Sequence, residues 1–285
     1  MSFRLILDSG AYSAWTSKSK ISLNDYTQFC LANQSQFDYI VNLDVIPAEF
    51  GQVGIPEKER ERSAKEGWIN FLKMIDAGIP QNKIIPVFHQ EENFRWLKKM
   101  MLKSKYIGIS PANDRNTPQK IEWLDECMKY VCNEYGMPIV KFHGFGITSV
   151  KILRRYPFYS ADSSTWVKFS RYGTILIPKT NKNQWRYDKN PIPIQVTKRA
   201  SSRKEDNWKH FDSIPKEAQD VVVKYVTEKG FEMGESKFDD KKEIAIRSGV
   251  RNSHRIRDLI NLQFFIDLEK NLPKWPSRYE GGGGF

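Results

Sequence analysis

The sequence predicts an α/β protein: a TIM-like (β/α)8 barrel with basic insertions and further helices in its C-terminal part. Two observations lead to this expectation. Over the first 165 residues, short apolar runs rich in β-branched residues alternate with longer segments of helical periodicity, and each apolar run finishes on a polar residue. With 285 residues, 40% of them hydrophobic and 28% charged, the chain is long enough for one such barrel and has a soluble, globular composition.

Six strands are predicted in the first part of the chain, with helices between them. The strands are expected at 3–8, 38–44, 83–89, 105–110, 138–143 and 158–162, and the helices at 22–34, 57–78, 92–103, 117–136 and 148–156. Ser22 is the expected cap of the first helix, with Asp25 at capping-box spacing, while Pro118 stands in the first turn of the fourth. An open doubly wound sheet would show the same alternation, but no G-x-G-x-x-G motif follows the first strand, which counts against a dinucleotide-binding sheet.

The pattern changes after residue 165. Two more apolar runs, at 173–178 and 191–196, are predicted strands, and helices are expected at 215–230 and 252–272. We therefore divide the chain into a main barrel part with the active site, 1–165, and a second part, 166–285. The second part completes the barrel and adds a basic, aromatic segment and the C-terminal helices. If the barrel closes with eight strands, the runs at 173–178 and 191–196 supply the missing two in a permuted order.

The six predicted strands all end on polar residues. These residues are Asp8, Asp44, His89 followed by Gln90, Ser110, His143 and Asp162. Any one of them has a simple explanation, because strand ends often meet water. In a parallel barrel, however, the carboxyl ends of the strands converge on one mouth, where active sites lie. Three aspartates and two histidines at such ends therefore predict an active site.

The net charge of +11 indicates a polyanionic partner, most often a nucleic acid. Basic residues gather with interleaved aromatic residues between 166 and 209, a pattern that suits backbone neutralisation and base stacking. The residues predicted to contact nucleic acid are Lys168, Arg171, Lys179, Lys182, Arg186, Lys198, Arg199 and Arg203. The simpler alternative is a basic, solvated surface.

Three aspartates at one mouth suit glycosyl chemistry. One carboxylate can trap C1′ of a sugar covalently, while a second carboxyl group protonates the leaving base, as in retaining glycosidases. A third carboxylate can accept hydrogen bonds from the N–H groups of a guanine edge. No cofactor is expected, because a glycosyl-enzyme conserves the energy of the bond.

The sequence does not predict a metal site, a membrane-spanning segment or a signal peptide. The three cysteines, Cys30, Cys127 and Cys132, form no C-x-x-C pair, so we expect no metal site and treat them as small buried residues. No apolar run approaches the roughly 20 residues that cross a bilayer, and the N-terminus lacks the features of a signal peptide. We expect a cytoplasmic protein with no membrane partner, and leave its oligomeric state, a homodimer included, open.

Five segments resemble motifs of tRNA-guanine transglycosylases, in the same order and at similar spacing. "LDSGAYS" resembles the family's D-S-G-G-F-Q motif. "KFHGFGITSVKILRRYPFYSADSS" resembles its Y-L-M-G-V-G motif, the following helix and the F-D-C segment that bears the nucleophile. "VNLDVIP", "PVFHQ" and "YIGISP" fall where the family has its base-reading aspartate, its I-V-Q-G segment and its G-G-L-A-V-G segment.

The resemblance implies a role for each matched residue. Asp162 would be the nucleophile on C1′, Asp8 the general acid/base, and Asp44 the residue that recognises the base. Either His89 or Gln90 would take the place of the family's glutamine. The other residues expected at the base pocket are Ser9, Gly10, Ser110, His143, Gly144, Phe145 and Gly146.

The departures from the family concern the substrate. Its Cys-x-Cys-x-x-Cys zinc motif, which helps to seat tRNA, is absent, and the chain begins almost at the D-S-G strand, where the family has two earlier strands. These features resemble the short phage and bacterial relatives, the DpdA group, that exchange guanine in DNA for a 7-deazaguanine such as preQ0. The resemblance therefore implies DNA and a free 7-deazaguanine base as partners, with the target base flipped out of the duplex.

Three alternatives remain at this point. The same chemistry could act on tRNA, which the missing zinc motif makes the weaker choice. Water could replace the incoming base, as in a base-excision glycosylase. The chain could also be a nucleic-acid-binding barrel without catalytic activity.

Overall fold

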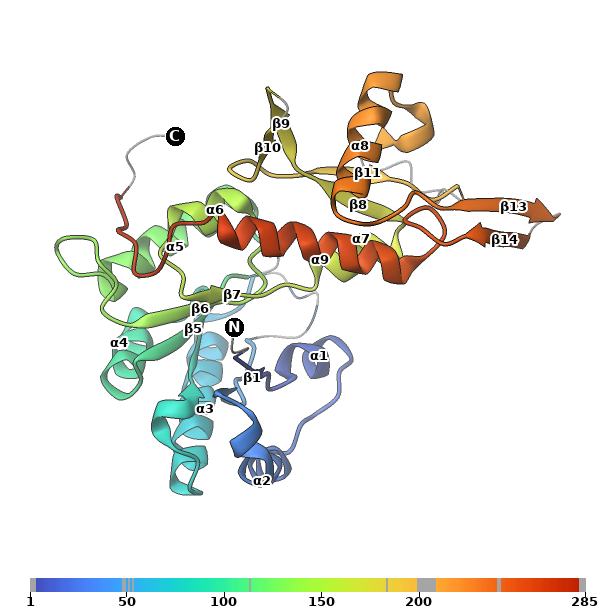
Figure 1. Cartoon of the computed structure of the whole chain (residues 1–285). Helices are drawn as coiled ribbons and strands as arrows, with labels where there is room; N and C mark the ends of the chain where they lie inside the picture. Colours follow the sequence, from blue (N-terminus) through green and yellow to red (C-terminus); the bar gives the residue numbers. More distant parts are fainter. Residues whose placement is uncertain are drawn as a thin grey trace. The chain divides into compact units, whose positions relative to one another are not determined.

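The computed structural model describes residues 4–47, 50, 52, 54–112, 114–182, 184–198, 209–239 and 242–281 (Figure 1). Its contacts divide the chain into two units, one formed by residues 1–147, 155–162 and 274–285 and the other by residues 148–154 and 163–273. The chain thus passes between units at residues 147, 154, 162 and 273, whereas the sequence led us to expect one boundary at 165. The predicted α/β class is confirmed in the form of a mixed α/β protein with parallel sheets.

Parallel strands form the centre of the first unit. Those within the described residues are β1 (Ile6–Leu7), β2 (Tyr39–Val41), β3 (Ile84–Ile85), β4 (Val87–His89), β5 (Tyr106–Ser110), β6 (Lys141–Gly144) and β7 (Ser160–Ala161). They make two parallel sheets, in the orders β1-β2-β3 and β4-β5-β6-β7. Because β3 and β4 together occupy the strand predicted at 83–89, all six predicted strand positions contain a strand.

The break between β3 and β4 is a local effect of Pro86, which has no N–H to donate. Asn42 bridges the break: its N–H donates to the Ile85 carbonyl at 3.1 Å, and its side-chain oxygen accepts from the Val87 N–H at 3.1 Å. On the other side, the Gly108 N–H donates to the Pro86 carbonyl at 2.8 Å. The strands therefore follow one another from β1 to β7 in chain order.

Helices fill the connections between these strands. They are α1 (Ala11–Thr16), α2 (Leu23–Asn33) with the 3-10 turn η1 (Gln34–Gln36), α3 (Glu57–Asp76), the 3-10 turn η2 (Gln81–Lys83), α4 (Phe94–Lys103) and α5 (Thr117–Val131). Ser22 caps α2, as predicted, by accepting a hydrogen bond from the Asp25 N–H at 3.3 Å. Asn116 caps α5 in a capping box with Gln119. The short helix α1 was not predicted.

Apolar side chains of strands and helices pack into one core within the first unit. Ile40 of β2, Ile84 of β3, and Phe71 and Met74 of α3 are at most 1% exposed. Burying a side chain of this size contributes roughly 1.5–3 kcal/mol. This packing holds the strands in position and so determines where their carboxyl ends emerge.

Tyrosine rings meet at the amino-terminal ends of the parallel strands. Tyr39 opens β2, Tyr106 opens β5 and Tyr159 precedes β7, so other strands lie between them. Even so, the ring centroid of Tyr106 lies 4.8 Å from that of Tyr39 and 5.3 Å from that of Tyr159, both in edge-on contact. These contacts bring together side chains of strands that are not hydrogen-bonded to each other, at the amino-terminal ends of the parallel strands.

The second unit combines a mixed sheet, two hairpins and helices (Figure 1). Its described elements are α6 (Val150–Arg155), α7 (Thr165–Arg171), β8 (Thr174–Ile177), β9 (Lys179–Asn181), β10 (Gln184–Arg186), β11 (Ile192–Gln195), β12 (Lys209–His210), η3 (Phe211–Ser213), α8 (Lys216–Glu228), β13 (Glu235–Asp239), β14 (Lys242–Arg247) and α9 (His254–Lys270). The sheet has the order β12-β11-β8, and the hairpins are β9–β10 and β13–β14.

Helix α9 is fastened to β8 and α7 by buried polar side chains. Asn261 accepts from the Leu176 N–H at 2.9 Å and donates to the carbonyl groups of Trp166 and Thr174, both at 3.1 Å. Arg257 donates to two further backbone carbonyl groups. Buried polar groups are tolerated when they are bonded in this way, so these contacts fix the helix in one register.

The two runs expected to complete the barrel do not join the parallel strands. β8 and β11 pair antiparallel with each other, with Ile175 opposite Ile194, and both belong to the second unit. The predicted permuted completion by these segments is therefore wrong. The reason is their connection: the hairpin β9–β10 lies between them and turns the chain back, whereas a parallel pair needs a crossover, usually through a helix.

The C-terminal segment returns to the first unit after α9. The Tyr279 N–H donates to the Gly136 carbonyl at 2.8 Å, and its hydroxyl donates to Asp125 at 2.7 Å. The Tyr279 ring also stacks on Tyr156, with ring centroids 5.7 Å apart. A single boundary in the sequence could not anticipate this return, because its partners lie more than a hundred residues earlier in the chain.

Candidate active site

Three aspartates gather at the carboxyl ends of the parallel strands. Asp8 directly follows β1, Asp44 lies three residues beyond β2, and Asp162 directly follows β7. Partial burial, followed by the negative charges of Asp44 and Asp162, raises the pKa of Asp8. Asp8 therefore interacts electrostatically with both other carboxyl groups. We call Asp8, Asp44 and Asp162 together the carboxylate site.

Asp162 is held as an anion. The Gly146 N–H donates to its Oδ1 at 2.8 Å, and His143 Nε2 lies 3.7 Å from the same oxygen. Partial burial disfavours the anion, but the contacts with His143 and Gly146 outweigh it and lower the pKa of Asp162. The side chain is still 56% exposed, so the anion is accessible to a ligand.

Asp8 has the opposite tendency. Its raised pKa means that it keeps a proton at a higher pH than an ordinary aspartic acid. The N–H groups of Gly10 and Ser9 act against this shift without cancelling it. The site thus contains one carboxyl group, Asp162, whose ionised form is favoured, and another, Asp8, whose protonated form is favoured. Acid-assisted nucleophilic displacement requires one group of each kind.

Asp44 belongs to a buried chain of charged groups. His89 Nε2 lies 2.9 Å from Asp44 Oδ2, and its Nδ1 lies 3.1 Å from Glu92 Oε1. Burial disfavours the imidazolium, but hydrogen bonds to the two carboxylates and their charges outweigh it and raise the pKa of His89 to about 10. His89 is therefore protonated at neutral pH and donates from both ring nitrogens.

This arrangement orients Asp44 as a hydrogen-bond acceptor. One carboxylate oxygen faces His89, and the other accepts from the Ser9 hydroxyl at 3.0 Å. Each carboxylate oxygen has a further lone pair, so Asp44 can still accept from a ligand with adjacent N–H groups. Glu92, which the sequence reasoning missed, supports the arrangement, because its second oxygen accepts from the His89 backbone N–H at 3.2 Å.

Gln90 and Ser110 lie next to this chain. The Gln90 N–H donates to the Ser110 carbonyl at 3.0 Å, which extends the β4–β5 pairing by one residue. The Gln90 side-chain oxygen accepts from the Ala112 N–H at 3.0 Å. Sequence reasoning left open whether His89 or Gln90 takes the place of a glutamine at the pocket. In the structure His89 contacts Asp44, whereas Gln90 braces the loop after β5.

The Gly144–Phe145–Gly146 turn shapes the wall beside Asp162. Gly146 has φ 64°, a left-handed conformation that places its N–H on Asp162. The Phe145 ring packs over Gly108 and edge-on to His143, 4.4 Å between centroids. A Cβ on Gly108 would meet that ring at 2.4 Å, so this glycine makes room for Phe145.

A cavity of about 350 Å³ has a size that suits a small planar ligand. It adjoins the carboxylate site through His89, which contacts Asp44, but Asp8, Asp44 and Asp162 are not in its lining. Its lining includes the predicted residues His89, Gln90 and Ser110. Sequence reasoning missed its aromatic wall, in which the Trp15 ring lies 5.9 Å from Tyr12 and 5.1 Å from Phe50. The spacing of Tyr12 and Trp15, one helical turn apart just after Asp8, was the signal available in the sequence.

The predicted nucleic-acid-binding residues belong to the second unit. Those described are exposed, and they are Lys168, Arg171, Lys179, Lys182, Arg186 and Lys198, while Arg199 and Arg203 lie outside the described residues. Arg186 pairs with Asp188 at 2.6 Å, and the Lys198 ammonium lies 5.6 Å from the centre of the Phe238 ring. The remaining four form no ion pair with any described carboxylate, so their charge is available to a polyanion.

Comparisons with known proteins give no match to a family model, a curated protein or a solved structure. Within the described part of the chain, no group of three or more His, Cys, Asp or Glu side chains is arranged to hold a metal ion. Across the same residues, no helix has the length and apolar character needed to cross a membrane.

Proposed function

We propose that this protein is a DNA-guanine transglycosylase, which exchanges guanine in DNA for a 7-deazaguanine base by double displacement. The observation that carries the proposal is the opposite displacement of the pKa values of Asp8 and Asp162 within one site. Retaining glycosyl transfer needs an ionised carboxylate to attack the sugar and a protonated carboxyl group for the leaving group. The resemblance of the surrounding segments to guanine transglycosylases supports the same two roles.

In the first displacement, an oxygen of Asp162 attacks C1′ of the target nucleotide. The bond between C1′ and N9 breaks, its electron pair goes to the departing guanine, and the guanine takes the proton of Asp8. An ester between Asp162 and C1′ and an ionised Asp8 remain. The N–H of Gly146 and the ring of His143 orient the attacking carboxylate.

The second displacement reverses these steps with a new base. The 7-deazaguanine gives its N9 proton to Asp8 and attacks C1′ through N9. The ester bond breaks, and its electron pair returns to Asp162. Both carboxyl groups regain their starting states, so the exchange needs no external source of energy.

Asp44 supplies the selection of the base in this proposal. A guanine edge carries two adjacent donors, N1–H and the exocyclic amine, and Asp44 offers free lone pairs between His89 and Ser9. An adenine edge lacks this pair of donors and would leave a buried acceptor unsatisfied, at a cost of about 1–3 kcal/mol. The aromatic wall with Tyr12 and Trp15 provides a face against which a flat base can stack.

We also assign the parallel strands to a (β/α) barrel. Their chain order and the contact of Tyr106 with Tyr39 and Tyr159 support this architecture. DNA as the substrate is supported by the uncompensated cations of the second unit, among them Lys168, Arg171 and Lys179. Each such contact with a phosphate makes binding more dependent on salt.

The proposal is tested by incubating the protein with labelled guanine and either duplex DNA or tRNA. We expect label in DNA and none in tRNA. A parallel reaction with DNA alone, stopped by denaturant, should retain a covalent protein–DNA species that Asp162→Asn abolishes. Asp220→Asn, which changes an exposed aspartate of α8, is the matched control and should behave like the parent protein.

Other outcomes identify the competing functions. Label in tRNA alone would move the same chemistry to tRNA. Release of guanine without incorporation would identify a base-excision glycosylase. Salt-dependent binding of DNA without exchange or covalent capture would identify a binding protein without catalytic activity.

A further inference from the structure

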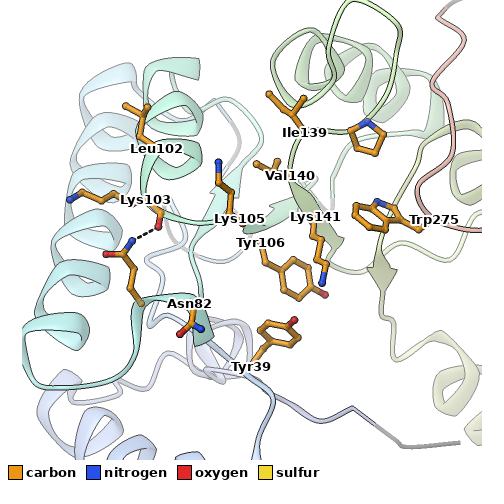
Figure 2. Close-up of a pocket in the computed structure, with 12 residues that line it drawn as sticks. Tyr39, Asn82, Leu102, Lys103, Lys105, Tyr106, Ile139, Val140, Lys141 and Trp275 are labelled. Atoms are coloured by element: carbon orange, nitrogen blue, oxygen red, sulfur yellow. Dashed lines mark hydrogen bonds between the residues drawn. The ribbon is translucent and has the colours of Figure 1, made fainter.

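A second cavity, of about 760 Å³, lies in the first unit at the amino-terminal ends of the parallel strands (Figure 2). Tyr39, Tyr106 and Lys141, the first residues of β2, β5 and β6, contribute to its lining. The carboxylate site lies at the carboxyl ends of the parallel strands, beyond β1, β2 and β7. The cavity is therefore a separate site, which we call the lysine pocket.

The lining of the lysine pocket is positively charged. It contains Lys103, Lys105 and Lys141 and no acidic residue. None of the three ammonium groups forms an ion pair with a described carboxylate. Figure 2 shows the side chains of Lys105 and Lys141 reaching into the space between the walls, whereas that of Lys103 leads away from it. Two uncompensated cations thus face the pocket.

Aromatic rings form a second feature of the pocket. The Lys141 ammonium lies 4.2 Å from the centre of the Tyr159 ring and 6.0 Å from that of Trp275. Trp275 packs edge-on against Tyr159 at 5.2 Å, and Tyr39 packs edge-on against Tyr106 at 4.8 Å. Such rings offer flat apolar surfaces to a planar ligand, and they hold Lys141 without neutralising it.

Two polar groups in the pocket have no partner of their own. The Trp275 indole N–H is buried and makes no hydrogen bond with the described residues. The Asn82 side chain is exposed at the rim and makes none with the described residues either, whereas its neighbour Gln81 donates to the Lys103 carbonyl. The Asn82 amide is therefore accessible to a ligand at the rim, whereas the Trp275 N–H lies beneath the surface of the pocket.

We propose that the lysine pocket binds a nucleoside 5′-monophosphate, with its phosphate at Lys105 and Lys141 and its base against the aromatic rings. The volume falls within the range of sites for small ligands. Inorganic phosphate would make no contact with the aromatic rings or with the apolar side chains of Val140 and Ile139. A neutral aromatic ligand would make no use of the charge of Lys105 and Lys141. This proposal does not depend on base exchange at the carboxylate site.

The test is calorimetric titration of the full chain with AMP, GMP, CMP and UMP, each separately. We expect at least one of them to bind, and to bind more tightly than its own nucleoside or inorganic phosphate. Changing both lysines, as Lys105→Ala with Lys141→Ala, should weaken binding of that nucleotide about tenfold or more, because charge-assisted hydrogen bonds to phosphate are lost. Binding of the nucleoside should change little.

Matched variants separate this site from the rest of the protein. Lys103→Ala removes a lysine that leads away from the pocket and should leave affinity unchanged. Asp44→Asn alters the opposite ends of the strands and should leave the affinity for AMP, CMP and UMP, which lack the guanine edge, unchanged. Trp275→Leu should weaken the nucleotide and the nucleoside alike, and circular dichroism checks that each variant is folded.

Several results would overturn the proposal. These are no binding by any of the four nucleotides, equal binding of phosphate alone, or full affinity in the double lysine variant. Loss of affinity in Asp44→Asn but not in the lysine variant would place the nucleotide at the carboxylate site. Binding of single-stranded DNA through Lys105 and Lys141, without binding of mononucleotides, would replace the nucleotide by a nucleic-acid strand. Base exchange is measured separately, so its failure leaves this result intact.

Discussion

The two ends of the parallel strands in the first unit carry opposite chemistry. At the carboxyl ends, acidic groups are coupled to one another and to histidines: Asp162 to His143, and Asp44 to His89. At the amino ends, Lys105 and Lys141 line a cavity that contains no acidic residue. The parallel strands therefore have acidic residues with shifted pKa values at their carboxyl ends and lysines without an ion-pair partner at their amino ends.

The difference shows that one set of strands can support reactive groups at one end and a ligand-binding surface at the other. Coupled titratable groups have displaced pKa values, which suit proton transfer and nucleophilic attack. Ammonium groups without an ion-pair partner can bind an anionic ligand but do not transfer protons or attack a substrate. Variants at the carboxyl ends should therefore change rates and pH profiles, and variants at the amino ends should change affinity or stability.

The largest effect is expected from Asp162→Asn, which removes the carboxylate that we propose attacks C1′. We expect base exchange to fall by about 10⁴-fold or more, because covalent catalysis is lost while the fold is kept. Single-turnover incorporation of labelled guanine into DNA measures the effect. An Asp162→Asn protein that exchanges at the parent rate would remove the nucleophile from the carboxylate site.

Asp8→Asn should lower exchange by roughly 10²–10⁴-fold, since general acid–base catalysis contributes about that much. The pH profile gives the sharper test. Because the pKa of Asp8 is raised, the parent should lose activity as the pH rises through that value and the acid loses its proton. Because the pKa of Asp162 is lowered, activity should fall on acidification only once that carboxylate is protonated.

In the Asp8→Asn variant, the fall at high pH should disappear and the fall at low pH should remain. The rate of incorporation across a pH series reports both. If the fall at high pH persists in the variant, another group provides the proton.

His89→Gln should destabilise the fold by about 3 kcal/mol at pH 7, because it leaves the buried carboxylates of Asp44 and Glu92 without their shared cation. The pKa of His89 is raised to about 10, above its usual value. Its stabilising contribution is therefore complete at and below a pH of about 6.5, and is lost as the pH rises through 10.

Urea unfolding of the parent and of His89→Gln at pH 7 and above pH 10 measures this difference, which should shrink at the higher pH. His254→Gln, at the exposed first position of α9, is the matched control. A difference that stays constant with pH would mean that the protonated state of His89 does not stabilise the fold.

The smallest effect is expected from Tyr279→Phe at the amino-terminal side. It removes the hydrogen bond to Asp125 that helps to anchor the segment carrying Trp275. We expect a loss of about 1 kcal/mol in the free energy of unfolding, as for a typical hydrogen bond, and exchange at the parent rate. Tyr135→Phe, at an exposed tyrosine, is the control. A large loss of exchange in Tyr279→Phe would show that the two ends of the strands are not independent.

The secondary structure of the first unit could be predicted from local patterns. Apolar runs bounded by polar residues gave the positions of β1 through β7, and capping residues such as Ser22 gave a helix start. The positions of Asp8, Asp44 and Asp162 followed, because parallel strands that alternate with helices place their carboxyl ends on the same side. His89 was assigned to the site, but its bonds to Asp44 and Glu92 were not foreseen.

Other features lay beyond the sequence alone. An apolar strand has the same pattern whether its neighbour runs parallel or antiparallel, so the pairing of β8 with β11 could not be read from either segment. The basic segment was found by composition, whereas the lysine pocket has no local signature. Its lining comes from β2, η2, the end of α4, the start of β5, the segment that leads into β6, and the returning tail.

By itself, the sequence determined which segments become strands and helices and which polar residues stand at the strand ends, since periodicity and capping act over a few residues. Tertiary structure alone decided how those residues are charged and what they contact. The pKa values of Asp8, Asp162 and His89 depend on partners brought close by folding. Trp275 reaches the lysine pocket for the same reason: hydrogen bonds and ring contacts formed over long separations hold its segment against the first unit.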